Sequence, residues 1–296
     1  MAKHWFLQPL TESDNWIASR YWHRRIMKAC LPWDVRPVIS VSPKCFTKAL
    51  PCRRTDMTML KAKALSVKRH EIKFFISHAD YEYARSILAE LMERDPNQTN
   101  ERGYFIRSLY FDDILNTAVE DKLDGIEERD KYRIRVYSPD QQWAKLERKR
   151  KHNQFVDKSS VRISRDQAYQ MIDGEYDWLL DMESNSARSI FFDLKRRYFR
   201  PTAMIDYDRE VYLMDYNDIR VTFDMNLRIS TEETDLFSDQ LEMEQIQRGD
   251  TIIMEVKFNH CLPSWFPQIF RLNGTTAQAI SKYCLGRMHM REFYSA

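Results

Sequence analysis

The stretch at residues 131–151, KYRIRVYSPDQQWAKLERKRK, most constrains the fold because it places charge where a β-strand normally places its core. The runs YRIRVY and WAKLERK alternate with period 2, and the charged positions of each run keep one parity. The linker SPDQQ has the composition of a turn, so the two runs predict a β-hairpin. Taken alone, the pattern is also that of an edge hairpin with one solvated face. The one-sided charged positions are Arg133, Arg135, Lys145, Glu147 and Lys149.

The same one-sided charge recurs along the chain. The segments VKRHEIKFFIS, RPTAMIDYDREVY, DIRVTFDMNL and DTIIMEVKF each set charged residues against an apolar opposite face. If the apolar faces pack outward against helices, the charged faces line the inside of a closed antiparallel barrel. The further charged positions are Glu71, Lys73, Arg209, Arg220, Glu255 and Lys257.

Helices are predicted between these strands, which gives an α+β fold. An S-x-x-D signal at Ser77 begins the first helix, and Ser164 with Gln167 caps another that Gly174 ends. A third helix is predicted at residues 187–197 and the last at 276–287. The polar stretch KHNQFVDKSSVR, after the hairpin, is predicted to be a mobile connection.

A barrel lined with so many cations needs an anion inside it, because each buried like charge otherwise costs several kcal/mol. Polyphosphate or the triphosphate of a nucleotide fits, since Arg binds phosphate oxygens in bidentate fashion and Lys acts as a point charge. The glutamates among these cations indicate a Mg²⁺ or Mn²⁺ ion held by carboxylates and substrate phosphates. The sequence has no P-loop, GxGxxG, HExxH or GxSxG motif.

The charge is divided unevenly along the 296 residues. Residues 1–68 contain 13 Lys/Arg and 4 Asp/Glu, which leaves 33 and 40 for residues 69–296. An acidic body argues against nucleic acid as a partner. No run approaches ~18 consecutive apolar residues, so no membrane span is expected. The five cysteines lack metal-ligand spacing, which predicts free thiols in a reducing cytoplasm.

Residues 1–66 show no sustained period, and we expect an irregular basic N-terminal extension outside the fold. The predicted domain covers residues 67–290, and residues 291–296 form a tail. The chain is long enough for one large domain with an ordinary core.

A set of segments in a fixed order resembles the VTC-type polyphosphate polymerase domain, a branch of the triphosphate tunnel metalloenzyme superfamily. The segments are RHEIKFF, IRSLYFDD, KLDG, KYRIRVY, KLERK, RPTAMIDYDRE, IRVTFD, MEVKF and SKY, over about residues 68–290. The resemblance implies an eight-stranded antiparallel β-barrel tunnel with a charged interior and helices packed outside.

The resemblance also implies roles for the charged residues. Catalytic phosphate ligands would be Arg133, Arg135, Lys149, Arg209 and Arg220. Substrate-binding residues would be Lys73, Lys145, Tyr207, Lys257, Ser281 and Lys282. Glu255 would bind the metal, with Glu147 and Glu71 as further candidates.

The implied activity is a metal-dependent transfer of the γ-phosphoryl group of ATP to a growing inorganic polyphosphate chain, with Mn²⁺ or Mg²⁺ as cofactor and a membrane partner left open. Two alternatives stand beside it. One is a triphosphatase or polyphosphatase in which Glu71 or Glu147 orients a water, and the other is a polyphosphate-binding module without catalysis. The tunnel hydrolases begin with E-x-E-x-K, whereas this chain has Arg69 in place of the first carboxylate, which favours the polymerase.

Overall fold

The computed structural model describes residues 69–98, 100–152, 155–246, 251–269 and 276–295. These belong almost entirely to one compact unit, Arg69–Phe258 with Leu262–Ala296. The extension predicted for residues 1–66 lies outside the described residues. No helix in the described part of the chain has the length and apolarity needed to cross a membrane.

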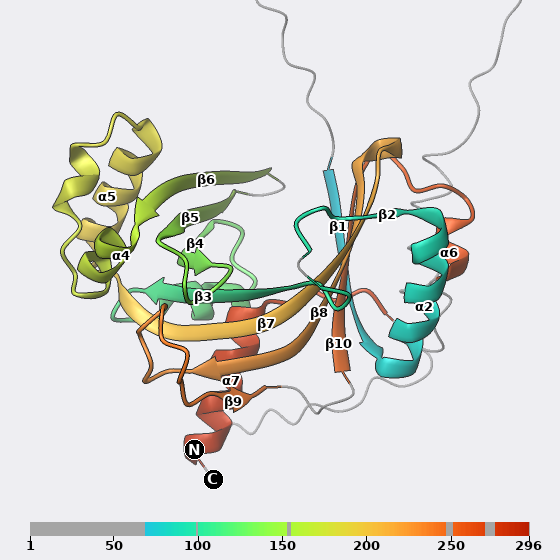
Figure 1. Ribbon diagram of the computed structural model, residues 1–296. Coiled ribbons are helices and arrows are strands. Elements are labelled where there is room, and N and C mark those ends of the chain that lie inside the picture. Colours follow the sequence, from blue (N-terminus) through green and yellow to red (C-terminus); the bar gives the residue numbers. More distant parts are fainter. Residues whose placement is uncertain (1–68, 99, 153–154, 247–250, 270–275, 296) are drawn as a thin grey trace, which may run out of the picture. The chain divides into compact units, whose positions relative to one another are not determined.

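An antiparallel sheet organises this unit (Figure 1). Its main path of eight strands runs in the order β1-β10-β8-β7-β3-β4-β5-β6, and two-residue strands β2 (Glu93–Arg94) and β9 (Glu244–Gln245) pair with β7 and β8. The eight strands are β1 (Arg69–Ser77), β3 (Tyr104–Asp112), β4 (Arg129–Val136), β5 (Trp143–His152), β6 (Phe155–Ser164), β7 (Arg200–Met214), β8 (Ile219–Ser230) and β10 (Thr251–Asn259).

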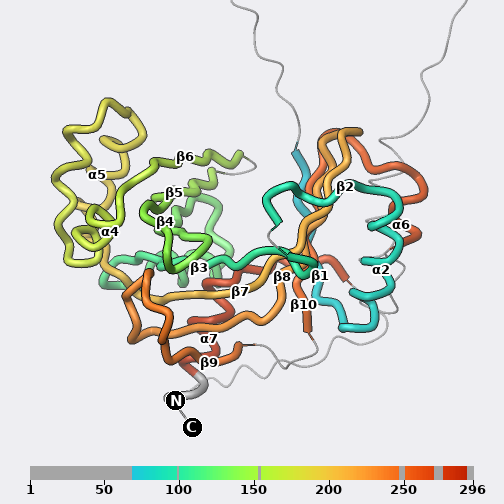
Figure 2. The backbone as a smooth tube through the Cα atoms, in the orientation of Figure 1, coloured from blue at the N-terminus to red at the C-terminus, as the bar shows by residue number. Residues whose placement is uncertain are grey.

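The strand order confirms the predicted antiparallel α+β architecture. The sheet is strongly bent, as the backbone tube in Figure 2 lets the reader follow. Strands β1 and β6 are the two ends of the path, and within the described residues they do not pair with each other. The sheet is therefore not closed by hydrogen bonds, although its bend is consistent with a tunnel.

Helices cover one face of the sheet, and two apolar clusters fill the space between these helices and the strands. Strands β4, β5 and β6 pack against α4 (Arg165–Ile172), α5 (Asn185–Arg197) and the 3-10 turn η1 (Asp177–Leu180), with Ile134, Leu146 and Leu194 among the buried residues. Strands β1, β8 and β10 pack against α2 (His78–Leu91) and α6 (Phe266–Ile269). Burial of this apolar face supplies the driving force that the charged face cannot.

A third cluster lies on the opposite face, where α3 (Thr117–Leu123) and α7 (Lys282–Ser295) cover one part of the sheet. Ile205 and Tyr207 of β7 belong to this cluster, whereas Met204 of the same strand packs in the cluster on the other face. Helix α7 comes very close to β8, because a Cβ added at Gly286 would lie 2.3 Å from Ile229 Cδ1. The face predicted to be charged is thus partly apolar and covered by helices.

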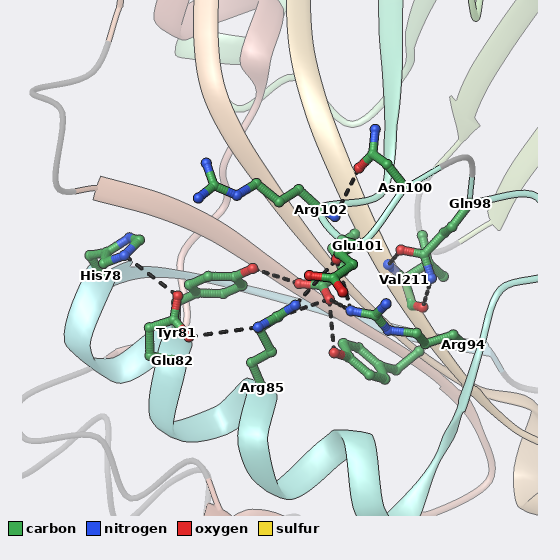
Figure 3. A network of polar contacts seen from close by, with 12 residues as sticks. His78, Tyr81, Glu82, Arg85, Arg94, Gln98, Asn100, Glu101, Arg102 and Val211 are labelled. Atoms are coloured by element: carbon green, nitrogen blue, oxygen red, sulfur yellow. Dashed lines mark hydrogen bonds and ion pairs between the residues drawn. The ribbon is translucent and has the colours of Figure 1, made fainter.

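A buried carboxylate fastens α2 to β7. Glu210 is 0% exposed and accepts hydrogen bonds from the hydroxyls of Tyr81 (2.6 Å) and Tyr212 (2.8 Å). Arg85 Nε (3.1 Å) and Arg94 Nη2 (2.8 Å) donate to the same carboxylate. Figure 3 shows Tyr81 and Arg85 reaching from α2 toward the point that Arg94 also approaches. Each acceptor atom of this buried charge is therefore engaged, as its burial requires.

Two local predictions were wrong. Residues 155–164 form β6, which pairs with β5 along its whole length, in place of a mobile connection. The last helix begins at Lys282, because residues 276–281 run beside β1, where the Gln278 amide donates to the Lys73 carbonyl over 2.8 Å. The helix continues to Ser295, so it includes most of the segment 291–296 predicted as a tail.

Candidate functional site

One face of the bent sheet gathers charged side chains, and we call it the charged face. Its cations are Lys73, Lys131, Arg133, Arg135, Lys145, Lys149, Lys158, Arg209, Arg220 and Lys257 from the strands and Lys282 from α7. Its carboxylates are Glu71, Glu147, Asp224 and Glu255. Lys149 Nζ of β5 lies 3.7 Å from Glu71 Oε2 of β1, although these strands are not neighbours. The face is therefore concave, and the end strand β1 meets β5, the strand next to the other end, through these side chains.

Lys73 stands at the centre of a carboxylate pair. Its Nζ lies 2.8 Å from Glu71 Oε1 and 3.0 Å from Glu255 Oε2, and Lys257 also contacts Glu255. Burial raises the pKa of Glu255, but Lys73 and Lys257 outweigh it and hold that pKa well below its ordinary value. Burial and Glu255 likewise raise the pKa of Glu71, whereas Lys73 and Lys149 bring it below the ordinary value. Both carboxylates are ionised near neutral pH.

A second group joins β7, β8 and α7. Arg209 forms a bidentate pair with Asp224, with Nε to Oδ1 at 2.6 Å and Nη2 to Oδ2 at 2.8 Å, and Lys282 contacts the same carboxylate. These cations hold the pKa of Asp224 at about 2 against the effect of burial. The ring of Tyr207 lies 5.3 Å from the Arg209 guanidinium and 4.8 Å from Lys282 Nζ. Tyr207 is buried, so it packs between the two cations.

The predicted hairpin at residues 131–151 is present as strands β4 and β5, and its register places Arg133 opposite Glu147 and Arg135 opposite Lys145. Arg133 Nε donates to Glu147 Oε2 over 2.7 Å, and Arg135 Nη1 lies 3.8 Å from the same oxygen. Burial raises the pKa of Glu147, but the two arginines bring it to about 2. Arg135 Nη2 also donates to the Tyr207 hydroxyl over 3.1 Å, which links this group to the second one.

Two predicted residues are more loosely held. Arg220 lies opposite Lys257 in the β8–β10 register, and its Nη2 is 3.6 Å from Asp95 Oδ2. Its side chain is 37% exposed. Lys145 Nζ lies 5.2 Å from the centre of the Tyr137 ring and has no carboxylate within 4.0 Å in the described residues. Both contribute charge with little internal compensation.

Three members of the charged face were not predicted as site residues. Lys131 donates to Ser281 Oγ over 2.6 Å, and burial lowers its pKa. Burial and the nearby Arg133 lower the pKa of Lys158 to about 8. Lys131 and Asp224 share the parity of predicted neighbours and could have been found from the alternation. Lys158 was hidden because its strand was missed.

The donor set at Lys73 also fits a divalent cation. Carboxylate oxygens are the ligands that Mg²⁺ and Mn²⁺ prefer, and Glu71 and Glu255 converge on a single ammonium group. No group of three or more His, Cys, Asp or Glu side chains suited to a metal occurs in the described ranges. The arrangement therefore fits a cation that takes two protein carboxylates and its other ligands from phosphate. Glu147, the remaining candidate, contacts arginines instead.

Comparisons with known proteins give one family. A family model described as the VTC domain matches residues 68–291. A Hippeastrum protein, described as a candidate adenylyl cyclase with a dominant triphosphatase activity, is 14% identical, with a TM-score of 0.45 over 75% of this chain and 96% of that chain.

Two further solved structures share the same low similarity. A Bacillus halodurans protein, described as a candidate adenylate cyclase, is 11% identical, with a TM-score of 0.38 over 76% of this chain and 88% of that one. A Pyrococcus horikoshii protein is 14% identical, with a TM-score of 0.38 over 76% and 99%. A search of curated proteins finds no match.

Proposed function

Because the chain belongs to the VTC domain family, we propose that it is a metal-dependent polyphosphate polymerase. It transfers the γ-phosphoryl group of ATP to the end of a growing inorganic polyphosphate chain in the cytoplasm and releases ADP. The terminal oxygen of the chain attacks the γ-phosphorus, and the bond from that phosphorus to the bridging oxygen of ADP breaks.

The observation that carries the proposal is the excess of cations on the charged face. The carboxylates of this face are all ion-paired, yet Lys131, Lys145 and Lys158 have no carboxylate within 4.0 Å in the part of the chain that is described. Their uncompensated charge favours binding of a polyanion. A phosphate chain supplies negative charge at regular intervals along its length, which suits a concave face that spans several strands.

Positioning and charge neutralisation suffice for this reaction. The guanidinium groups of Arg133, Arg135 and Arg209, which pair with Glu147 and Asp224, would bind phosphate oxygens and hold them in line when substrate is present. Glu255 with Glu71 would hold the divalent cation, which when bound neutralises charge on the transferring phosphoryl group. The attacking phosphate is already anionic at neutral pH, so no general base is required.

Hydrolysis is the rival chemistry, and the carboxylates are poorly suited to it. Glu147 has a pKa of about 2 and is held by Arg133, so it is too weak a base to take a proton from water. Glu71 is engaged by two lysines. These contacts support phosphoryl transfer to a phosphate acceptor over transfer to water.

The test is to incubate the full chain with ATP and Mn²⁺ and to resolve ADP, orthophosphate and polymer. Polymer formed together with ADP is the expected result. Orthophosphate without polymer would identify a triphosphatase or polyphosphatase. Tight polyphosphate binding without turnover would identify a binding module.

A further inference from the structure

A basic cavity lies apart from the charged face. It has a volume of about 660 Å³ and is bounded by the start of β7, the residue before α3, the residue after β8 and the middle of α7. Its lining residues are Asn116, Arg200, Pro201, Thr202, Thr231, Arg287, Met290 and Arg291. Three of these are arginines, and no carboxylate lines the cavity.

The three guanidinium groups are only partly compensated. Arg287 donates to Asn116 Oδ1 over 2.9 Å and to the Tyr283 hydroxyl over 3.1 Å, and both acceptors are neutral. Arg291 pairs with Glu120, but each of these side chains is about half exposed. The Arg200 side chain is exposed, and it makes no hydrogen bond or ion pair with another described residue, although its backbone pairs with Asp112 in the β3–β7 ladder. Positive charge therefore dominates the cavity.

Besides Glu120, two neighbouring acids, Asp112 and Asp113, are engaged by other partners. Asp112 accepts hydrogen bonds from the Tyr283 hydroxyl over 2.8 Å and from the Ala118 amide over 2.9 Å. Asp113 is held by Arg197 Nη2 at 2.7 Å. These carboxylates are fixed by their own partners, so they leave the cavity arginines available to an external anion.

A pair of stacked tyrosines separates the cavity from the charged face. Tyr283 contacts Arg287 on one side and stacks on Tyr110 at 4.9 Å on the other. Tyr110 in turn accepts a hydrogen bond from Arg133 over 3.2 Å. No cation of the charged face lines the cavity. The two basic regions are therefore distinct but adjacent.

We propose that this cavity is a second anion site that binds the phosphate groups of an oligophosphate. Three guanidinium groups around a cavity of this volume suit several tetrahedral anions in a row better than a single carboxylate. Arg287 and Arg291 are one turn apart on α7, so they present their forks on the same side of the helix. The proposal goes beyond the transfer reaction, since a second site needs no catalysis. Its ligand is either a free short oligophosphate or the distal part of a chain that also occupies the charged face.

Calorimetric titration of the full chain distinguishes these cases, with tripolyphosphate and long-chain polyphosphate as the two probes. The cavity variant is Arg200→Gln/Arg287→Gln/Arg291→Gln, and Arg200→Gln/Arg291→Gln is a milder one that keeps the internal hydrogen bonds of Arg287. The control removes the same charge from exposed arginines elsewhere, as Arg102→Gln/Arg188→Gln/Arg196→Gln. A charged-face variant, Arg133→Gln, reports on the other site.

We expect wild type and control to bind two equivalents of tripolyphosphate and the triple cavity variant to bind one. Loss of that equivalent identifies a free oligophosphate as ligand. An at least tenfold weaker binding of long polyphosphate alone identifies a chain that spans both sites. The proposal is overturned if both cavity variants bind both probes as the control does. A failure of the charged face would instead appear as unchanged binding in Arg133→Gln.

Discussion

Lys73 holds together two carboxylates that would otherwise repel each other. With Glu71 and Glu255 at 2.8 and 3.0 Å, its ammonium group gains two ion pairs that offset its own desolvation and raise its pKa. A divalent cation placed at the same carboxylates would share this function with the lysine. The residue-level question is therefore whether Glu255 serves a metal or only its lysine neighbours.

Replacing Glu255 with Gln should decide this. The amide keeps the size of the side chain but removes the charge that would hold the cation, so turnover should fall by a factor on the order of 100 or more. Mn²⁺ titration of the activity is the measurement, with Glu90→Gln on the exposed side of α2 as the matched control. An unchanged Mn²⁺ dependence with a modest loss of stability would assign Glu255 to Lys73 and Lys257 alone.

Lys158 should make polyphosphate binding sensitive to pH. Lys158 is exposed to solvent, but desolvation by the surrounding charged face and the nearby Arg133 lower its pKa from 10.5 to about 8, so at pH 9 roughly a tenth of the folded chains carry its charge. Between pH 8 and 10.5, the lysine in the unfolded chain still binds a proton that the folded chain has lost. The free energy of unfolding therefore rises with pH in that range. The affinity for polyphosphate should fall roughly tenfold from pH 7 to 9.

The Lys158→Arg variant isolates this effect, because Arg stays charged throughout. Dissociation constants of labelled polyphosphate at pH 7 and 9 provide the comparison. The variant should lose less affinity than wild type over this interval. Equal losses in the two proteins would show that Lys158 does not contribute charge to the bound chain.

At the scale of elements, most of the strands and helices that have a regular local sequence pattern were predicted correctly. Period-2 alternation of apolar and charged residues located β1, β4, β5, β7, β8 and β10, and the Ser164–Gln167 capping box begins α4 as predicted. The same alternation put most of the charged face on one side. Its ion-pair partners could not be predicted, since Arg133 meets Glu147 through cross-strand register and Lys73 meets Glu255 through strand order.

The missed elements lack a local signal. Most side chains of β6 are exposed on both faces, and only Val161 and Ile163 pack into the core, so the strand depends on pairing with β5. Residues 276–281 have a helical pattern but pair at Gln278 with the backbone of β1. In both cases a tertiary partner overrides the local sequence.

The attachment of α2 to β7 depends on Glu210. The change Glu210→Ala leaves Arg85 and Arg94 without their shared carboxylate and two tyrosine hydroxyls without an acceptor. Breaking one side of such a buried pair costs about 3–5 kcal/mol, which urea denaturation would measure. As a control, Glu82→Ala replaces an exposed carboxylate on α2 and should change the free energy of unfolding by less than about 0.5 kcal/mol. Similar losses for both would refute the fastening role.

At the scale of the whole described unit, the sequence predicted a closed barrel, and the structure shows a bent sheet in which Glu71 of the end strand β1 meets Lys149 of β5, next to the other end. In the described residues, β1 and β6 form no strand pair with each other. A polyanion on the charged face would draw cations of both ends toward itself. Ligand binding should therefore stabilise this unit as a whole.

Polyphosphate should raise the melting temperature of the wild type by mass action. A ligand at 100 times its dissociation constant adds about 2.7 kcal/mol to the free energy of unfolding. The variant Lys149→Gln/Lys257→Gln, in which both side chains are partly exposed, should lose most of that increase, whereas Arg102→Gln/Arg196→Gln should keep it. An equal increase in all three proteins would place the polymer away from the charged face.

The proposed transfer is tested by following the γ-phosphoryl group of ATP into its product. ATP labelled at the γ-phosphorus is incubated with the full chain, Mn²⁺ and a polyphosphate primer, and the label in polymer is compared with the ADP released. We expect one labelled phosphate in polymer for each ADP, with both products lost together in Arg209→Gln. Label that appears in orthophosphate while the primer stays unlabelled would contradict the proposed transfer.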